Sequence, residues 1–332
     1  MKSGKQSFSS EKGFRDTLYA FQTSRVILTA YELDIFSNII TEGATSKDIA
    51  KALRTDLRAT DRLMNALCAI GLLRKKDSIF YNSDFSGFYL SKRSPGYLKG
   101  FGHTVNMWNT WSNLTEVVRT GKSIARKPQA NTSNNWAESF IGAMHERAKE
   151  NARHVIGLIP LYGIQSMLDI GGGSGVYSME FVKRDSKNKA TVFDLPDIIP
   201  ITKKYVDDAE LTKQFSYIKG NYNEDALGTG YDMIFLSAIV HINSAEQNLA
   251  LVKKCYDALN KNGLIVIQDH LMEDDRSAPF AGALFALNML VGTEHGDTYT
   301  ETEIRDWYKK AGFSKTERVD TFNNGMIIGR KK

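Results

Sequence analysis

The fold of this 332-residue chain is decided by one short stretch, Leu168-Asp169-Ile170-Gly171-Gly172-Gly173-Ser174-Gly175. An apolar run that predicts a β-strand comes directly before it, and a helical pattern begins directly after it, near Val176. Glycines between a strand and a helix permit a tight turn and let a ligand approach the backbone closely. The stretch therefore predicts a cofactor loop. A loop that is glycine-rich only for packing is the plain alternative.

The register of the glycines distinguishes between two kinds of cofactor. In either possible register, the dinucleotide pattern G-x-G-x-x-G needs a glycine where Val176 or Ser178 stands. A carboxylate at Asp169 would repel a pyrophosphate but tolerates the ammonium group of a methionine moiety. Further along, Asp194 ends a second predicted strand, where an acid can accept hydrogen bonds from both ribose hydroxyls. Together these features favour S-adenosylmethionine over a nicotinamide dinucleotide.

From residue 165 onward the pattern alternates between strands and helices, which is typical of a parallel sheet covered by helices. The predicted parallel strands are 166–170, 190–194, 215–219, 231–237 and 264–269. The chain ends differently, because strands at 315–320 and 326–329 flank Asn323-Asn324-Gly325, a strong hairpin signal. We therefore predict an α/β fold, a Rossmann-like doubly wound sheet that ends in an antiparallel hairpin.

The N-terminal part of the chain carries a mostly helical pattern. Apolar residues at helical spacing from 14 to 40 predict a long amphipathic helix broken once. Thr45 with Asp48 resembles a capping box that opens a second helix, and Asp56 caps a third. A strand-like stretch follows at 78–81. This order of helix, turn, helix and β-ribbon predicts a winged-helix domain.

A winged helix in isolation suggests DNA binding through its third helix. Here that helix carries only Arg58 and Arg62 as cations among apolar residues, so its exposed face is poor in phosphate contacts. We therefore predict that residues 1–104 form a winged-helix-like dimerisation domain and do not bind DNA. Connecting helices over 105–160 are expected to cover the active site, and 161–332 to form the S-adenosylmethionine-binding catalytic domain.

Composition narrows the class of protein. Hydrophobic residues make up 42% of the chain and charged residues 24%, and the net charge of +5 is too mild to demand a nucleic-acid partner. Cys68 and Cys255 form no CxxC pair, which fits a reducing cytoplasm and gives no zinc site. The longest apolar run, 278–292, is shorter than the roughly 20 residues that a membrane span needs, so it predicts a buried helix.

Several further pieces match one family of enzymes. They are the winged-helix pattern, Trp111, residues 118–122, Phe140, Met144, residues 168–175, 193–196, Gly220-Asn221 and His241. Over nearly its whole length the chain resembles the class I S-adenosylmethionine-dependent small-molecule O-methyltransferases, typified by plant caffeic acid and acetylserotonin methyltransferases and their bacterial polyketide and pigment relatives. The resemblance implies methyl transfer to a hydroxyl group, phenol or enol, of a small molecule. It also implies a homodimer formed through the N-terminal domain.

The resemblance implies roles for particular residues. His241, at the end of the fourth strand, is expected to be the general base, and Asp269, at the end of the fifth, the acid that flanks it. The expected cofactor-binding residues are Asp169, Gly171, Gly173, Asp194, Leu195, Asn221, Tyr222 and Ser237. The expected substrate-binding residues are Phe140, Met144, Asn288 and Met289.

The chemistry of the reaction supports an imidazole base. A phenol with a pKa of about 10 is mostly protonated at neutral pH, so removing its proton is worth about 10² to 10⁴ in rate. His270 is a competing base, although consecutive residues at a strand end tend to point to opposite faces. His241, Asp269 and His270 could in principle ligate a metal, but no His-x-x-x-His pair or cysteine partner supports one. We therefore expect no metal.

The chain departs from the family pattern on the acceptor side. The family's His-Asp-Trp is His241-Ile242-Asn243 here, and the arginine of its later Arg-Thr pair is Tyr299. At two more positions a charged residue is absent: Thr298 stands where plant members have a second acid, and Ser237 stands where the family frequently has a lysine. Asn221 stands at a position where the family frequently has an aspartate.

Three alternatives therefore stay open. One is an S-, N- or C-methyltransferase, since a thiol with a pKa of about 8.5 needs less help from a base. The second is an adenosylmethionine-responsive winged-helix regulator. The third is a scaffold that binds the cofactor without methyl transfer.

Overall fold

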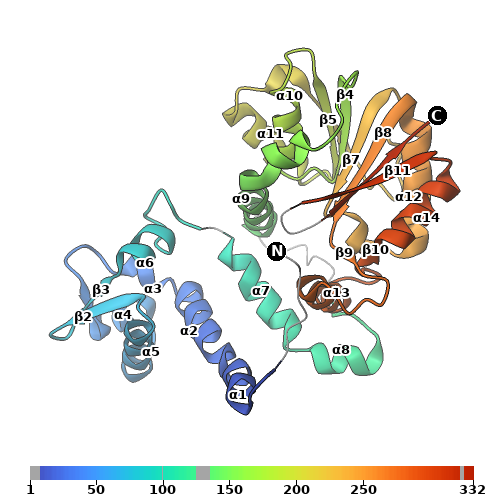
Figure 1. The fold of residues 1–332 in the computed structure, drawn as a ribbon. Coiled ribbons are helices and arrows are strands. Elements are labelled where there is room, and N and C mark those ends of the chain that lie inside the picture. The colour runs from blue at the N-terminus through green and yellow to red at the C-terminus, as the bar shows by residue number, and fades with distance from the viewer. Residues whose placement is uncertain (1–7, 99, 125–134, 322–324) are drawn as a thin grey trace. The chain divides into compact units, whose positions relative to one another are not determined.

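The computed structural model describes residues 8–98, 100–124, 135–321 and 325–332. Within these ranges the chain forms two compact units, one of residues 8–108 and the other of residues 109–332 (Figure 1). Helix α7 (Phe101–Trp111) runs across the boundary between them.

The N-terminal unit is mostly helical. Its helices are α1 (Glu11–Tyr19), α2 (Phe21–Glu32), α3 (Ile35–Asn38), α4 (Ser46–Leu53), α5 (Leu57–Ala69) and α6 (Asp84–Tyr89). Its small antiparallel sheet has the order β1 (Ala44–Thr45), β3 (Ile79–Asn82), β2 (Leu73–Lys76). The fully buried Phe36, Met64, Leu67 and Phe80 pack its core.

Two of the predicted helix starts are confirmed, while the first helix differs from its prediction. Thr45 and Asp48 form the capping box of α4, and the Asp56 side chain accepts from the Ala59 amide at the start of α5. The predicted helix from 14 to 40 is interrupted twice instead of once. Its second break lies at Asp34, which adopts a left-handed conformation (φ 58°) that an α-helix cannot continue through.

The C-terminal unit contains the predicted sheet, with the strand order β11-β12-β8-β7-β4-β5-β6. The strands are β4 (Ser166–Ile170), β5 (Lys189–Asp194), β6 (Phe215–Lys219), β7 (Tyr231–Ser237), β8 (Leu259–Asp269), β11 (Lys315–Asp320) and β12 (Gly325–Arg330). Strands β4 to β8 are parallel, and β12 pairs antiparallel with both β8 and β11. The α/β fold class with a closing antiparallel pair is therefore confirmed. Asn323 and Asn324 of the predicted turn lie outside the described residues.

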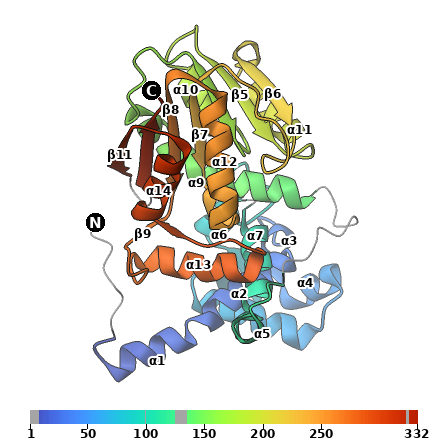
Figure 2. The ribbon, with the colours of Figure 1, turned by 90° about the vertical axis from the view of Figure 1, so that its right-hand side faces the viewer.

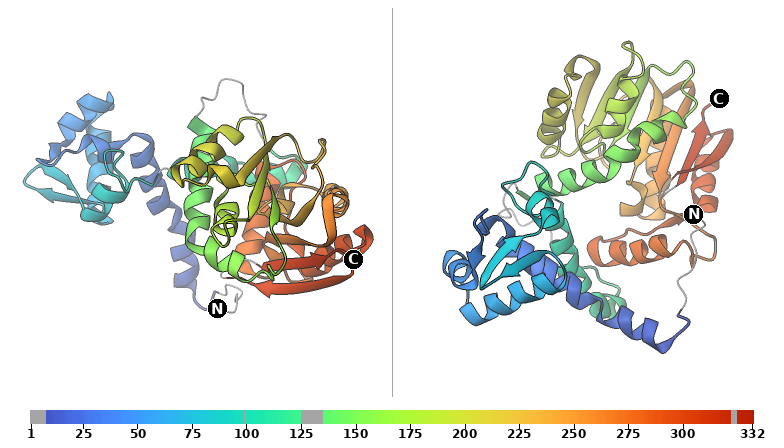
Figure 3. Two further views of the ribbon diagram at one scale, coloured as in Figure 1. Left: turned by 90° about the horizontal axis from the view of Figure 1, so that it is seen from above. Right: turned by 60° about the vertical axis from the view of Figure 1, so that its left-hand side comes forward.

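Helices cover both faces of this sheet, because alternate residues of each strand point to opposite sides. Leu168, Ile234 and Ile265 pack with residues of α12 (Ala245–Ala258) and α14 (Glu301–Ala311), and Figure 2 shows these two helices beside the sheet. Their neighbours Met167 and Met233 pack instead with residues of α10 (Val176–Val182) and the end of α9 (Asn135–Gly157), the helices that come forward in the right-hand view of Figure 3. The remaining helices are α8 (Leu114–Thr120), α11 (Ile199–Asp208), α13 (Phe280–Gly292) and the 3-10 turns η1 (Thr212–Gln214) and η2 (Val240–Ile242).

The apolar run at 278–292 forms α13, which is only partly buried. Gly282, Met289 and Val291 are buried, whereas Phe280 and Leu284 are exposed. The prediction of a buried helix is therefore wrong for one side of α13, because an apolar composition does not determine whether neighbouring elements cover every side of a helix. Over the described ranges, the chain offers no helix with the length and apolarity that crossing a membrane requires.

Candidate active site

The glycine loop has a backbone that few other residues could adopt. Gly171, Gly173 and Gly175 have φ angles of 64°, 55° and 73°, in the left-handed region. The Gly171 amide donates to the Phe193 carbonyl of the neighbouring strand at 2.7 Å, and a Cβ at Gly171 would overlap the side chain of Ile239. The loop is therefore tied to β5 and leaves no room for a side chain at its first turn.

Asp169 lies beneath this loop. Its side chain is 1% exposed, and its Oδ2 accepts from the Ser178 hydroxyl at 2.7 Å. Burial raises the pKa of Asp169 to about 7, with a further contribution from the negative charge of Asp194. The carboxyl group is thus balanced between its neutral and ionised forms near neutral pH, and a nearby cation would favour the ionised form.

Asp194 ends β5 and meets the loop directly. Its Oδ2 accepts from the Gly173 amide at 2.8 Å, and its Oδ1 accepts from the Leu195 amide at 2.8 Å. Burial raises its pKa, whereas these two hydrogen bonds lower it. The structure thus brings together the glycine loop and the acid that the sequence places on the next strand.

The other predicted cofactor residues follow neighbouring strands. Asn221 and Tyr222 come after β6 and are half-buried. The Tyr222 hydroxyl donates to Asn243 Oδ1 at 3.4 Å, and burial raises its pKa to about 12. Ser237 ends β7 and donates its hydroxyl to Gln268 Oε1 at 3.1 Å. All of these positions lie at the carboxyl edge of the parallel strands, where ligands bind in open α/β sheets.

The donor set fits S-adenosylmethionine. The backbone of the left-handed glycines lies next to two carboxyl groups, those of Asp169 and Asp194, and burial raises the pKa of both. Carboxylates are suitable partners for a cationic group and for hydroxyls that donate. In the part of the chain that the structure describes, no cluster of three histidine, cysteine or acidic side chains could hold a metal ion.

Helix α9 contributes a residue to the loop that the sequence analysis missed. His145 is buried, its Nδ1 lies 2.9 Å from the Ser174 hydroxyl, and its ring stacks on Tyr205 with centroids 4.4 Å apart. Burial lowers the pKa of this imidazole, which favours its neutral form. A signal was present, because His145 lies one helical turn after the buried Ile141 and shares its stripe of the helix.

His241, in the turn η2 that follows β7, and Asp269, at the end of the adjacent strand β8, form a buried pair. His241 Nδ1 lies 2.8 Å from Oδ1 and 2.9 Å from Oδ2 of Asp269, and the two residues are 8% and 2% exposed. Burial raises the pKa of Asp269, but the charge of His241 and hydrogen bonds from His241 and His270 outweigh it, so that the net shift is downward. An ionised carboxylate only accepts, so in the neutral imidazole Nδ1 carries the proton and Nε2 presents its lone pair.

His270 stays close to this pair. Its amide donates to Asp269 Oδ1 at 2.8 Å, and its ring packs against Phe285 of α13 with centroids 4.4 Å apart. The same Phe285 ring meets His241 edge to face at 4.8 Å. Burial lowers the pKa of His270, which favours a neutral imidazole. Although Asp269 and His270 are consecutive, both imidazoles therefore border one aromatic ring that the sequence analysis did not single out.

The predicted acceptor residues lie on two helices. Phe140 and Met144 on α9 are half-buried, and Met289 on α13 is buried. Asn288 Oδ1 accepts from the indole Nε1 of Trp111 at 2.9 Å, which links the end of α7 to α13.

Comparisons with known proteins agree with this geometry. The O-methyltransferase domain family matches residues 111–314, and the O-methyltransferase dimerisation domain family matches residues 16–92. The chain is 29% identical to the 3-hydroxy-5-methyl-1-naphthoate 3-O-methyltransferase of Streptomyces sahachiroi, over 93% of this chain and 92% of that one. It is 27% identical to the tetracenomycin polyketide synthesis 8-O-methyl transferase of Streptomyces glaucescens, over 94% of both chains.

A solved structure has the same fold. It is an O-methyltransferase family protein from Burkholderia thailandensis, with a TM-score of 0.85 and 22% sequence identity. The match covers 98% of this chain and 99% of that one.

Proposed function

The chain belongs to the family of S-adenosylmethionine-dependent O-methyltransferases, and from this premise we propose that His241 deprotonates a phenolic or enolic hydroxyl of a small acceptor molecule. The observation that carries the proposal is the buried contact between His241 Nδ1 and the Asp269 carboxylate. This contact leaves Nε2 as the proton acceptor. As Nε2 takes up the proton, the carboxylate stabilises the imidazolium that forms. A positioned base of this kind contributes about 10² to 10⁴ in rate.

We propose that the glycine loop and the neighbouring strand ends hold the methyl donor. When bound, S-adenosylmethionine supplies a methyl group that its positively charged sulfonium activates for transfer. Asp194 would accept hydrogen bonds from ribose hydroxyls, and Asp169 would offset the positive charge of the methionine part. The other residues proposed for this half of the site are Gly171, Gly173, Leu195, Asn221, Tyr222 and Ser237.

The acceptor half is proposed to bind a flat aromatic molecule. Phe285 borders both His241 and His270, so its ring can orient an aromatic acceptor against the base. Phe140, Met144, Asn288 and Met289 are proposed to complete this half. Holding the acceptor oxygen at about 3 Å and in line with the transferring group would supply most of the remaining rate gain.

The N-terminal unit is proposed to form a winged-helix homodimer. Support comes from the dimerisation domain family that matches residues 16–92 and from the helix, turn, helix and ribbon order of this unit. Sedimentation equilibrium would measure the mass of the particle in solution. A mass of one chain over the working range of concentrations would contradict the homodimer.

The test of the function compares His241→Gln with the unchanged enzyme. The probe acceptors are a hydroxynaphthoate, the class named for the Streptomyces sahachiroi relative, and thiophenol. The measured quantity is the rate at which S-adenosylhomocysteine forms at saturating donor. We expect a loss of about 10² to 10⁴ toward the phenol and a much smaller loss toward the thiol, which ionises more readily. His270→Gln is the matched control.

Two results would contradict the proposal. Full activity of His241→Gln toward the phenol would remove His241 as the base. A larger loss for His270→Gln than for His241→Gln would assign that role to the neighbouring imidazole.

A further inference from the structure

The turn that carries His241 is held by hydrogen bonds to its backbone carbonyls. The Asn248 side chain donates to the Val240 carbonyl at 2.8 Å, and the Asp297 amide donates to the His241 carbonyl at 3.0 Å. Gly296 packs so closely that a Cβ there would overlap the same His241 carbonyl. The peptide groups on both sides of the His241 side chain are therefore fixed from outside η2.

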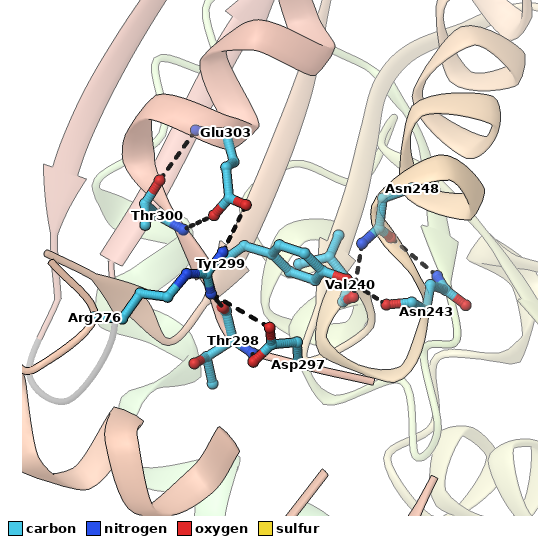
Figure 4. Close-up of polar contacts among 9 residues, drawn as sticks. All are labelled: Val240, Asn243, Asn248, Arg276, Asp297, Thr298, Tyr299, Thr300 and Glu303. Carbon is cyan, nitrogen blue, oxygen red and sulfur yellow. Dashed lines mark hydrogen bonds and ion pairs between the residues drawn. The ribbon is translucent and has the colours of Figure 1, made fainter. Parts of the chain in front are cut away.

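Tyr299 completes this set of contacts. Figure 4 shows its hydroxyl directed at the segment after Val240, where it donates to the Asn243 carbonyl at 2.5 Å. Tyr299 is 4% exposed, and its ring meets Trp307 edge to face with centroids 4.8 Å apart. Because packing fixes the ring, the hydroxyl can act as a rigid donor to the turn.

The segment around Tyr299 is itself held in place. Strands β9 (Leu271–Met272) and β10 (Tyr299–Thr300) pair in parallel, with Tyr299 opposite Leu271, two residues beyond Asp269. Arg276 adds a second tie, because its guanidinium donates to the Thr298 carbonyl at 2.6 Å and to Glu303 Oε1 at 2.7 Å (Figure 4). The position of Tyr299 is thereby set relative to the carboxylate that His241 contacts.

We propose that Tyr299 is a positioning residue for methyl transfer, whose hydroxyl holds the turn of His241 so that the imidazole stays aligned between Asp269 and the acceptor. This inference rests on the proposed role of His241. Tyr299 and Asn243 both occupy positions at which the sequence departs from the family pattern, and the structure joins these two positions by a hydrogen bond. The acceptor is the backbone carbonyl of residue 243, so the bond depends on the tyrosine at 299 and not on the side chain at 243.

The chain offers a matched control for Tyr299. Tyr308 is fully buried in the same core cluster, and its hydroxyl also donates to a backbone carbonyl, that of Ile327, at 2.8 Å. Tyr299→Phe and Tyr308→Phe therefore remove the same group from similar surroundings. Of these two tyrosines, Tyr299 alone contacts the segment of His241.

The experiment measures kcat, both KM values and the pH dependence of kcat for the two variants. Since small misplacements of reacting groups cost up to about 10²-fold in rate, we expect Tyr299→Phe to lower kcat by roughly 10- to 100-fold. The KM for S-adenosylmethionine should stay unchanged, and the limb of the pH profile that belongs to the base should move. Tyr308→Phe should lower thermal stability and leave kcat and the pH profile unchanged.

A double variant separates this inference from the proposed function. If Tyr299 acts through His241, adding Tyr299→Phe to His241→Gln lowers the residual rate no further. A further loss in the double variant would overturn the inference, as would a Tyr299→Phe enzyme that behaves like Tyr308→Phe. Full activity of His241→Gln alone would instead overturn the proposed function.

A milder pair of variants covers the case in which Tyr299→Phe does not fold. Arg276→Gln loosens the same segment from a side chain that is 43% exposed, and Arg318→Gln removes a comparable arginine, 39% exposed, that pairs with Glu301 and Asp320. We expect a lower kcat for Arg276→Gln alone. Equal kcat values for the two arginine variants would overturn the inference.

Discussion

The glycine loop and the turn of His241 lie on one sheet edge but are built by different means. The loop owes its shape to its own backbone, through left-handed glycines and hydrogen bonds to the next strand, such as that from Gly173 to Asp194. The turn owes its shape to distant groups, because Asp269 and Tyr299 reach it from 28 and 56 residues further along the chain. Changes in the loop should therefore alter binding of the methyl donor, whereas changes around the turn should alter the rate of transfer.

The largest effect that we expect is a loss of kcat in Asp269→Asn, which tests whether the turn of His241 acts on the rate alone. In Asp269→Asn the amide can donate to Nδ1, which favours the imidazole tautomer with its proton on Nε2 and so removes the base. We expect kcat to fall by about 10² to 10⁴. The dissociation constant of S-adenosylmethionine, measured by calorimetry, should stay unchanged. A parallel loss of donor affinity would show that the two regions are not separable.

A substitution in the loop should instead lower the affinity for the methyl donor and leave kcat nearly unchanged. Gly171→Ala places a Cβ where Ile239 lies, at a φ of 64° that costs an alanine about 1–2 kcal/mol. If binding must restore the displaced loop, donor affinity falls by about 5- to 30-fold, whereas kcat at saturating donor changes little. Gly163→Ala is the control, since it has a φ of 77° and open space around it. Equal donor affinities of the two variants would contradict a role of the glycine loop in binding S-adenosylmethionine.

The pH dependence of donor binding tests the loop through Asp169. The pKa of this group is raised to about 7, and a cationic ligand favours its ionised form. Donor affinity should therefore rise by roughly fivefold from pH 6 to 7, a range in which the donor's own amino group, with a pKa of about 7.7, stays mostly charged. Calorimetry at several pH values would measure it. A slope that persists in Asp169→Asn would assign the effect to another group.

The raised pKa of Asp169 also makes the stability of the ligand-free protein depend on pH. Since the folded pKa lies above the usual value of 3.8, the unfolded chain loses this proton first as pH rises. The contribution of Asp169 to stability is therefore greatest below about pH 4 and is lost as the pH rises through about 7.

The smallest expected effect concerns His145. His145→Phe keeps a ring against Tyr205 but removes the hydrogen bond to Ser174, which is worth about 0.5–1.5 kcal/mol. We expect donor affinity to fall by about 2- to 12-fold, measured by calorimetry, with kcat unchanged. Ser174→Ala removes the same bond from its other side, so the two losses should not add. Additive losses would show that the bond does not support the loop.

Some of these features follow from the sequence because the interactions are local. Strand, glycines and helix are contiguous, and Asp194 follows on the next strand, so spacing alone places them at one edge. Asp269 also ends a strand, and His241 lies in the turn after one, but their roles as a pair came from the resemblance to a family. The contacts of Phe285 and Tyr299 with this pair did not follow from the sequence. Both come from later segments whose register against the sheet no local pattern determines.

The sequence by itself determined the sheet, its closing antiparallel strands, the cofactor loop and the strand ends that carry the acids and the histidines. Periodicity and turn chemistry act over a few residues, and parallel strands necessarily share one carboxyl edge. Only the tertiary structure decided how His145 meets the loop, which side of α13 is exposed, and how Tyr299 holds the turn of His241. These contacts depend on side-chain packing between elements that are far apart in the chain, which no local pattern encodes.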